Sequence, residues 1–269
     1  MKLSVSNIAW APEQTEEAYK ILESMGVTGL EVAPGILFGE SSHDPFGEGQ
    51  KACDTARARA EAHGLELTSM QSLLYGVEGA GLFNSAEARA RLIAGIEDAI
   101  ALAGRLKVPN LVFGSPKNRT IPDGMDADAA REIWRKTFRR LGDKAHARGC
   151  VIALEPNPVE YETNFMTTLD ETLSVARNVD HRAIRVNLDL GALILTGEID
   201  EIDGRLADNK DMFSHVHLSA PHLAPLATEA EFVSKFLEVL DRHEITTWTS
   251  IEMRRGLEAV PAAIRACQR

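Results

Sequence analysis

The sequence predicts an α/β fold, a single (β/α)8 barrel over residues 1–269 with its active site at the C-terminal ends of the strands. Eight short apolar runs alternate with eight longer amphipathic stretches along the chain, which favours parallel strands joined by helices. Eight such units in about 250 residues favour a closed barrel over an open sheet. No linker, low-complexity tract or change in composition divides the chain, so we expect one domain.

The predicted strands are short runs rich in Val, Ile, Leu and Phe, each bounded by turn residues. In order along the chain they are Leu3–Asn7, Gly29–Val32, Leu65–Gln71, Asn110–Phe113, Val151–Glu155, Ile184–Leu188, Phe213–Leu218 and Thr249–Glu252. The first strand continues as Ile8-Ala9-Trp10-Ala11-Pro12. It therefore lacks the glycine-rich phosphate-binding motif that follows the first strand in many other α/β folds.

The predicted helices are the amphipathic stretches that lie between these runs. They are Thr15–Met25, Gln50–His63, Ala86–Lys107, Ala127–Arg148, Thr168–Val179, Asp200–Asn209, Glu229–His243 and Leu257–Cys267. Gly26, Gly64 and Gly149 each follow a helical pattern and precede a strand-like run, as glycines that end helices do.

Composition limits the classes of partner. Hydrophobic residues make up 44% of the chain, and 29 Lys and Arg stand against 40 Asp and Glu, a net charge of −11. This charge repels nucleic acid and anionic membranes, so we expect neither as a partner. Three cysteines without paired spacing, Cys53, Cys150 and Cys267, are typical of free thiols in a reducing compartment. No signal peptide or membrane span is evident, so we expect a cytoplasmic protein.

The last four predicted strands end in groups that bind metals. Glu155, Asp189 and Glu252 end three of them, and His215 and His217 lie near the end of the fourth. A single carboxylate in such a place is usually a helix cap or an ion-pair partner. Four neighbouring strands in one barrel, however, would bring these groups to one mouth, where one ion would bridge them. Three carboxylates and an imidazole suit Mn²⁺, Mg²⁺ or Co²⁺ better than metals that prefer thiolates.

Motifs at all eight strand ends carry a resemblance to a known family. They are Ser6-Asn7-Ile8-Ala9-Trp10, Glu31-Val32-Ala33-Pro34-Gly35, Gln71-Ser72-Leu73-Leu74, Val112-Phe113-Gly114-Ser115-Pro116-Lys117-Asn118-Arg119, Leu154-Glu155-Pro156-Asn157-Pro158, Leu188-Asp189-Leu190-Gly191-Ala192, His215-Val216-His217-Leu218-Ser219 and Ser250-Ile251-Glu252-Met253-Arg254. Through them the chain resembles the sugar phosphate isomerase/epimerase group of xylose isomerase-like TIM barrels. This group includes the ketose 3-epimerases and, more distantly, endonuclease IV.

The resemblance implies a site and a reaction. Glu155, Asp189, His217 and Glu252 correspond to the family's ligands of one divalent metal, for which we expect Mn²⁺ ahead of Mg²⁺, Co²⁺ or Zn²⁺. Glu155 and Glu252 correspond to the acid and base of the family's ketose epimerases. The chain departs from the best-known ketose epimerases at two positions, because Ala192 stands where they have histidine and Leu223 where they have arginine.

The chemistry follows from these residue types as well. A metal that chelates a keto-sugar acidifies the C–H beside the carbonyl, and two carboxylates then transfer the proton through an enediolate. Returning the proton to the other face gives epimerisation, and returning it to the neighbouring carbon gives isomerisation. We therefore expect a metal-dependent epimerase or isomerase of a ketose, keto-glycoside or related sugar, phosphorylated or not. The alternatives are a keto-polyol dehydratase on the same site, a metal-dependent phosphodiesterase of the endonuclease IV type, and a metal-free sugar-binding barrel.

Seven residues are candidates for substrate binding: Trp10, Gln71, Lys117, Asn157, Tyr161, His222 and Arg254. Trp10 would stack on the sugar or close the apolar wall. Lys117 forms either a basic cluster with Arg119 that attracts an acidic group, or part of a solvated loop. His222 lies just beyond the seventh strand as a substrate contact or a solvated loop residue, and His215 supports the metal site or is a hydrogen-bonded core histidine.

The remaining expectations concern partners. The substrate is a small sugar. The apolar outer faces of the predicted helices would permit assembly, so a homodimer or homotetramer is expected.

Overall fold

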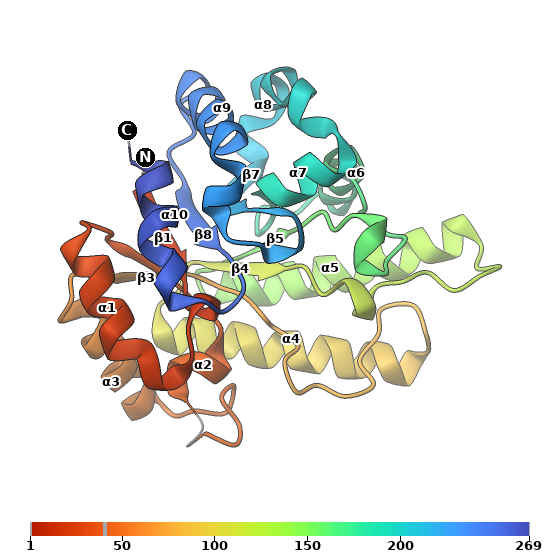
Figure 1. The fold of residues 1–269 in the computed structure, drawn as a ribbon. Coiled ribbons are helices and arrows are strands. Elements are labelled where there is room, and N and C mark those ends of the chain that lie inside the picture. The colour runs from red at the N-terminus through yellow and green to blue at the C-terminus, as the bar shows by residue number, and fades with distance from the viewer. Residues whose placement is uncertain (1, 40–41, 269) are drawn as a thin grey trace.

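The computed structural model describes residues 2–39 and 42–268, and its eight strands close into a barrel of parallel strands in the order β1 to β8 (Figure 1). The strands are β1 Lys2–Ser6, β2 Gly29–Val32, β3 Glu66–Met70, β4 Asn110–Phe113, β5 Val151–Leu154, β6 Ile184–Asp189, β7 Phe213–Ser219 and β8 Trp248–Glu252. Closure comes from β1 pairing in parallel with β8, in the register Lys2↔Trp248 to Val5↔Ile251. The predicted (β/α)8 barrel is confirmed.

Helices surround this barrel (Figure 1). They are α1 Thr15–Ser24, α2 Pro34–Phe38, α3 Gln50–Glu61, α4 Ala86–Leu106, α5 Ala127–Ala147, α6 Leu169–Val179, α7 Leu190–Thr196, α8 Ile202–Asn209, α9 Ala230–Arg242 and α10 Val260–Cys267. Sequence patterns located the longer helices to within a few residues at each end. The predicted helix Thr168–Val179 included its own N-cap, because the Thr168 hydroxyl accepts a hydrogen bond from the Glu171 backbone N–H.

Two short helices were not expected from the sequence. α2 and α7 follow β2 and β6 directly and have five and seven residues. Segments of one or two turns carry too little periodicity for a helical pattern to be recognised. Both lie on the C-terminal side of their strands, and α7 begins immediately after Asp189, so it shapes the mouth of the barrel.

The glycines that separate helices from strands behave as expected. Gly26, Gly64 and Gly149 have φ of 69°, 69° and 73°, a left-handed conformation that costs glycine little. Each lets the chain reverse from the end of a helix into the next strand.

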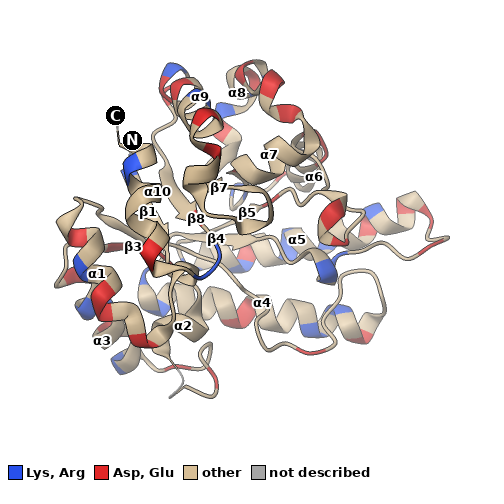
Figure 2. Ribbon diagram, viewed as in Figure 1, with Lys and Arg blue, Asp and Glu red and all other residues tan. Residues whose placement is uncertain are grey.

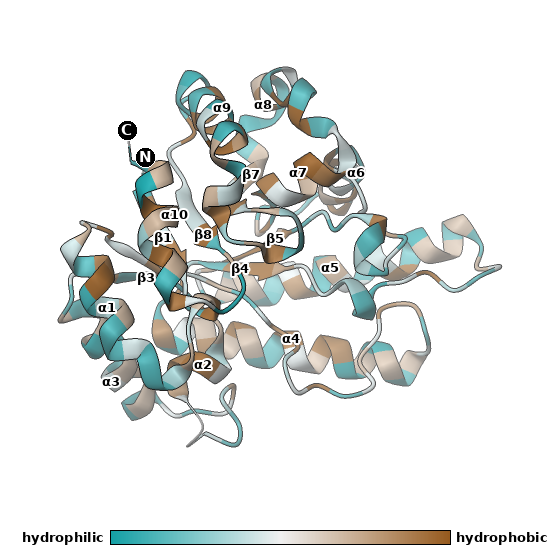
Figure 3. Ribbon diagram, in the orientation of Figure 1, coloured by the Kyte–Doolittle hydropathy of each residue, from teal (hydrophilic) through white to brown (hydrophobic). Residues whose placement is uncertain are grey.

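The helices have one apolar and one polar face. Figure 3 shows hydrophobic and hydrophilic residues in alternating bands along α1 and α4, and Figure 2 shows acidic and basic residues interleaved on the same helices. The apolar faces pack on the strands in one core, in which Phe113 of β4 meets Phe138 of α5 with ring centroids 5.6 Å apart. Among the described residues, no helix combines the length and apolarity that crossing a membrane requires.

Candidate metal centre

Four side chains converge at the C-terminal mouth of the barrel. Glu155 follows β5, Asp189 ends β6, His217 lies in β7 and Glu252 ends β8. One ligand atom from each lies within 4.8 Å of the others. Because parallel strands end on the same side of a barrel, residues far apart in the sequence meet here without any long loop.

His217 is at the centre of this group. Its Nδ1 lies 2.9 Å from Glu155 Oε1, 3.3 Å from Glu252 Oε2 and 3.9 Å from Asp189 Oδ2. The imidazole is buried, with 1% of its side chain exposed, whereas Glu155 and Glu252 are 14% and 12% exposed. Asp189 is 10% exposed, so all three carboxylates are more open to the mouth than the imidazole.

Glu155 is held by its neighbours. Asn187 Nδ2 donates to its Oε1 at 2.7 Å, and Asn157 Nδ2 donates to its Oε2 at 3.2 Å. Arg119 Nη2 donates to its backbone carbonyl at 3.0 Å. A Cβ at Gly114 would lie within 2.4 Å of Glu155 Oε2, so the carboxylate uses the space that only glycine leaves free.

Asp189 is fixed by the start of α7. Its Oδ1 accepts a hydrogen bond from the Ala192 backbone N–H at 2.6 Å, which makes it the N-cap of that helix. Its Oδ2 accepts a hydrogen bond from Ser219 Oγ at 2.7 Å. Both oxygens are thereby oriented before any ligand arrives.

The charges in this group influence one another strongly. Burial, together with the nearby Glu155 charge, raises the pKa of Asp189 to about 7. Burial opposes ionisation of Glu155 too, but the adjacent His217 imidazole and the hydrogen bonds from Asn157 and Asn187 lower its pKa. Burial also disfavours the charged form of His217, yet the Glu31 and Glu252 carboxylates raise its pKa well above the usual range. Without an ion, the carboxylates are thus neutralised partly by protons.

The donor set fits a divalent metal. His217 Nδ1 is buried and has no hydrogen-bond partner, although three carboxylates surround it. A buried nitrogen without a partner is costly unless it binds something. Three carboxylates and one imidazole are ligands for a hard or borderline ion. Cys53, Cys150 and Cys267 are free and buried elsewhere, as predicted, and contribute no thiolate to this set.

Three candidate substrate residues lie close to the metal-binding group or to its supports. Asn157 contacts Glu155, and its own Oδ1 lacks a partner. Gln71 Nε2 donates to Ser6 Oγ at 2.8 Å and lies 3.5 Å from Glu31 Oε2. Tyr161 accepts a hydrogen bond from the His222 backbone N–H at 3.0 Å, and the two rings pack edge to face.

The other candidates have different surroundings. Trp10 is completely buried and packs against Tyr19, but its Nε1 has no partner. Lys117 is 79% exposed and pairs with Glu162 at 3.4 Å. His222 and Arg254 are exposed. The expected basic cluster of Lys117 and Arg119 is wrong, because Arg119 is fully buried and turns inward to the Glu155 carbonyl.

Several supporting residues were missed by sequence reasoning. Asn187 and Ser219 lie on the strands that carry the ligands, and their short polar side chains gave no distinctive signal. Glu31 is fully buried and lies 3.0 Å from His217 Nε2. A signal for it did exist: a carboxylate between Leu30 and Val32, inside an otherwise apolar strand, requires a partner.

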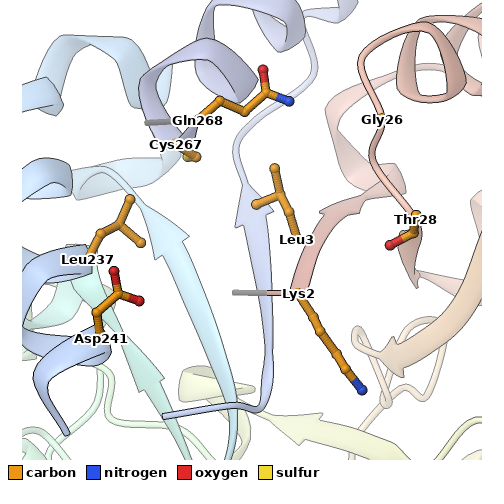
Figure 4. A pocket seen from close by; sticks show the side chains of 8 residues that line it. All are labelled: Lys2, Leu3, Gly26, Thr28, Leu237, Asp241, Cys267 and Gln268. Carbon is orange, nitrogen blue, oxygen red and sulfur yellow. The ribbon is translucent and has the colours of Figure 1, made fainter. Parts of the chain in front are cut away.

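A separate hollow of about 480 Å³ lies at the opposite end of the barrel (Figure 4). It is lined by Lys2 and Leu3 at the start of β1 and by Leu237, Cys267 and Gln268 of the last two helices and the residue that follows. The amino-terminal end of a barrel of this type generally serves stability, whereas function resides at the other end. The candidate site is therefore the C-terminal mouth.

Comparison with known proteins agrees with this fold. The family model described as xylose isomerase-like TIM barrel matches residues 19–269. No curated protein sequence matches the chain. The solved structure of 3-keto-D-glucoside 4-epimerase from E. coli is 20% identical, with a TM-score of 0.78, covering 99% of this chain and 97% of that one.

Two further solved structures show the same barrel. D-psicose 3-epimerase from Clostridium cellulolyticum H10, described with D-tagatose, is 17% identical, with a TM-score of 0.71, covering 100% of this chain and 96% of that one. An AP endonuclease of family 2 from Brucella melitensis is 18% identical, with a TM-score of 0.69 and full coverage of both chains. At these identities the likeness shows the shared fold.

Proposed function

Since this chain belongs to the xylose isomerase-like TIM barrel family, we propose that it is a divalent-metal-dependent epimerase or isomerase of a ketose, keto-glycoside or related sugar. The observation that carries this proposal is the unpartnered, buried His217 Nδ1 among three carboxylates. Sugar epimerases among the structural neighbours support the substrate class. Glu155, Asp189, His217 and Glu252 would hold the ion.

A bound divalent ion would polarise the substrate carbonyl and make the neighbouring C–H more acidic. We assign Glu155 and Glu252 as the acid and base, because both are partly exposed and they correspond to the acid and base of the family's ketose epimerases. One removes the proton from the carbon beside the carbonyl, and the other returns a proton to the opposite face or to the next carbon. Asn157 and Asn187 keep Glu155 in place by donating to its two oxygens.

The substrate contacts are also a proposal. Asn157 and Tyr161 follow the fifth strand and are mostly buried, and we place them, with Gln71, on the sugar hydroxyls. Trp10 is fully buried, so we assign it to the apolar wall of the site. His222, which packs on Tyr161, and Arg254 and Lys117, which are exposed, would act at the outer edge of the mouth.

Finer assignments follow the same reasoning. Mn²⁺ is proposed as the ion because the ligands are mostly oxygen, with Mg²⁺, Co²⁺ and Zn²⁺ as alternatives. A homodimer or homotetramer is proposed, to be checked by light scattering against the chain mass of 29.4 kDa. The free, buried thiols support a cytoplasmic location.

Proton exchange tests the reaction directly. Metal-stripped protein is restored with Mn²⁺, Co²⁺ or Mg²⁺ in D₂O, offered a panel of ketoses and keto-glycosides, and followed by proton NMR after removal of the ion. We expect metal-dependent deuterium incorporation beside the carbonyl, and the product distinguishes epimerisation, isomerisation and dehydration. Glu155→Gln and Glu252→Gln should each reduce the rate by about 100-fold or more.

Metal content separates the two roles of these glutamates. Each variant is assayed at a metal concentration that saturates its site. A loss of deuterium exchange that remains is then due to the missing acid or base and not to missing metal. Glu231→Gln, at an exposed position in the first turn of α9, is the matched control and should keep at least half of the exchange rate. If wild-type protein binds the ion but exchanges no substrate in the panel, enolisation is contradicted for that class, and if it binds no ion, the metal centre is contradicted.

A further inference from the structure

Glu31 is a buried carboxylate that the proposed reaction does not use. It lies in β2, on the side of the barrel away from the ligand-bearing strands β5 and β6 in the strand order, and none of its side chain is exposed. An isolated charge in such surroundings is costly unless strong partners compensate it. Its contacts therefore indicate what it does.

Each oxygen of Glu31 has a distinct set of neighbours. Oε1 lies 3.0 Å from His217 Nε2 and 3.4 Å from His215 Nε2. Oε2 lies 3.5 Å from Gln71 Nε2, which also donates to Ser6 Oγ at 2.8 Å. The two histidines of β7 and Gln71, which follows β3, thus hold the carboxylate in one orientation inside the barrel. Ser6 of β1 in turn holds Gln71.

The orientation of the His217 ring follows from this arrangement. A carboxylate accepts hydrogen bonds and does not donate them, so the proton between Glu31 and His217 resides on Nε2. The opposite nitrogen, Nδ1, then points at Glu155, Asp189 and Glu252 and has no hydrogen-bond partner. Nε2 of His217 thereby donates to Glu31, while Nδ1 faces the three carboxylates.

We propose that Glu31 is a positioning residue that fixes His217 with Nε2–H toward the barrel interior and Nδ1 free for a divalent ion. This inference rests on the proposed metal centre. In it, Glu31 supports the centre through His217 and touches neither the ion nor the substrate. A carboxylate behind a ligating histidine fixes its ring and increases the basicity of the ligating nitrogen. Replacement of such partners typically weakens metal binding by about 10- to 100-fold.

A rival arrangement uses the same atoms differently. Glu31, His215 and His217 are close enough to hold a second ion of their own. His217 would then have to bind metal through both nitrogens and lose its Nε2 proton. The two arrangements differ in stoichiometry, with one ion per chain in the first and two in the second.

Manganese titration distinguishes them. Metal-stripped wild-type protein, Glu31→Gln and Glu198→Gln are titrated with Mn²⁺, and free Mn²⁺ is measured by electron paramagnetic resonance. Glu198 is the matched control, because it is a mostly buried carboxylate whose partners are Leu169, Thr196 and Arg205. We expect one ion per wild-type chain, a Kd about 10- to 100-fold higher in Glu31→Gln, and a Kd within about twofold of wild type in Glu198→Gln.

The other outcomes separate the failures. An unchanged Kd in Glu31→Gln overturns the positioning role but leaves the metal centre intact. Two ions per wild-type chain, with one lost in Glu31→Gln, overturn it in favour of the second-ion arrangement. Absence of Mn²⁺ binding to the wild type contradicts the proposed function itself. Thermal melting of the metal-free variants verifies that each is folded.

A measurement on the unaltered protein is independent of any folding defect. In Zn²⁺-loaded wild type with ¹⁵N-labelled histidine, one ring should shift at Nδ1 on metal addition and keep a slowly exchanging proton on Nε2. A metal-induced shift at Nε2, or a metal-bound ring without that proton, would overturn the proposal whatever the variants show.

Discussion

At the residue scale, two neighbouring carboxylates of the proposed metal centre have pKa values shifted in opposite directions, although burial disfavours the ionised form of both. Asp189 has a pKa raised to about 7, because burial and the Glu155 charge both disfavour its ionised form. The pKa of Glu155 is lowered despite burial, because the His217 imidazole lies beside it and Asn157 and Asn187 donate hydrogen bonds to it. The difference arises from contact with one imidazole, since Glu155 is 2.9 Å and Asp189 3.9 Å from Nδ1.

These shifts predict how metal affinity depends on pH. The metal-free protein keeps a proton on Asp189 below about pH 7 and one on His217 to higher pH, and both atoms must be free of protons to bind an ion. Metal affinity should therefore rise with pH from 6 to 8, by at least about tenfold per unit where a proton is displaced. Calorimetry in two buffers of different ionisation enthalpy should show proton release. An affinity independent of pH would contradict the assignment.

At the scale of elements, the short helix α7 and the metal centre share one residue. Asp189 ends β6, caps α7 through Oδ1 and presents Oδ2 to His217 and Ser219. The strand end, the helix start and the ligand position are thus set together. Gly191 tightens this junction, because a Cβ there would lie 2.6 Å from Ser219 Oγ.

The double role of Asp189 predicts different results for two substitutions. Asp189→Asn retains an oxygen that accepts from the Ala192 N–H, so the metal-free protein should melt near the wild-type temperature, while metal affinity falls at least tenfold. Asp189→Ala removes the cap as well and should lower the free energy of unfolding by about 1 kcal/mol. Thermal melting and metal titration of both variants test this. Equal metal-free stability of the two would show that the cap contributes nothing.

At the scale of the whole molecule, barrel closure brings the site together. Glu31 of β2 reaches His217 of β7 across the interior, a separation of 186 residues in the chain. The proposed ligands lie at the ends of four consecutive strands, β5 to β8. Because these strands are held in one closed hydrogen-bonded sheet, an ion at the mouth would link elements from more than a third of the chain.

Metal binding should therefore stabilise the folded protein. At a free-ion concentration 100 times Kd, a ligand specific for the native state adds about 2.7 kcal/mol, which corresponds to a rise in Tm of several degrees for a protein of this size. Calorimetric melts with Mn²⁺ and with a chelator would measure the difference. Asp189→Asn is the control, and with at least tenfold weaker affinity it should gain at most about 1.4 kcal/mol at the same Mn²⁺ concentration. A wild-type Tm unaffected by Mn²⁺ would argue against binding at this site.

The sequence, with its family resemblance, was sufficient for the architecture and for the group of four candidate metal ligands. Periodicity and glycine-terminated helices identify eight strand–helix units because these signals are local. Parallel strands ending on one side then place Glu155, Asp189, Glu252 and the two histidines of the seventh strand together, and the family resemblance selects His217 of the two. Short helices such as α7 were not predicted, because they contain too few residues to show a helical repeat of apolar positions.

The supports of the site were decided by tertiary structure. Glu31, from a strand that carries no ligand, is identified as the partner of His217 only once the barrel closes. Arg119 looked like an exposed basic residue in a loop, but folding buries it against the Glu155 carbonyl. Local sequence determines which segments become strands and helices, whereas the partner of a buried charge depends on chain segments that only the closed barrel brings into contact.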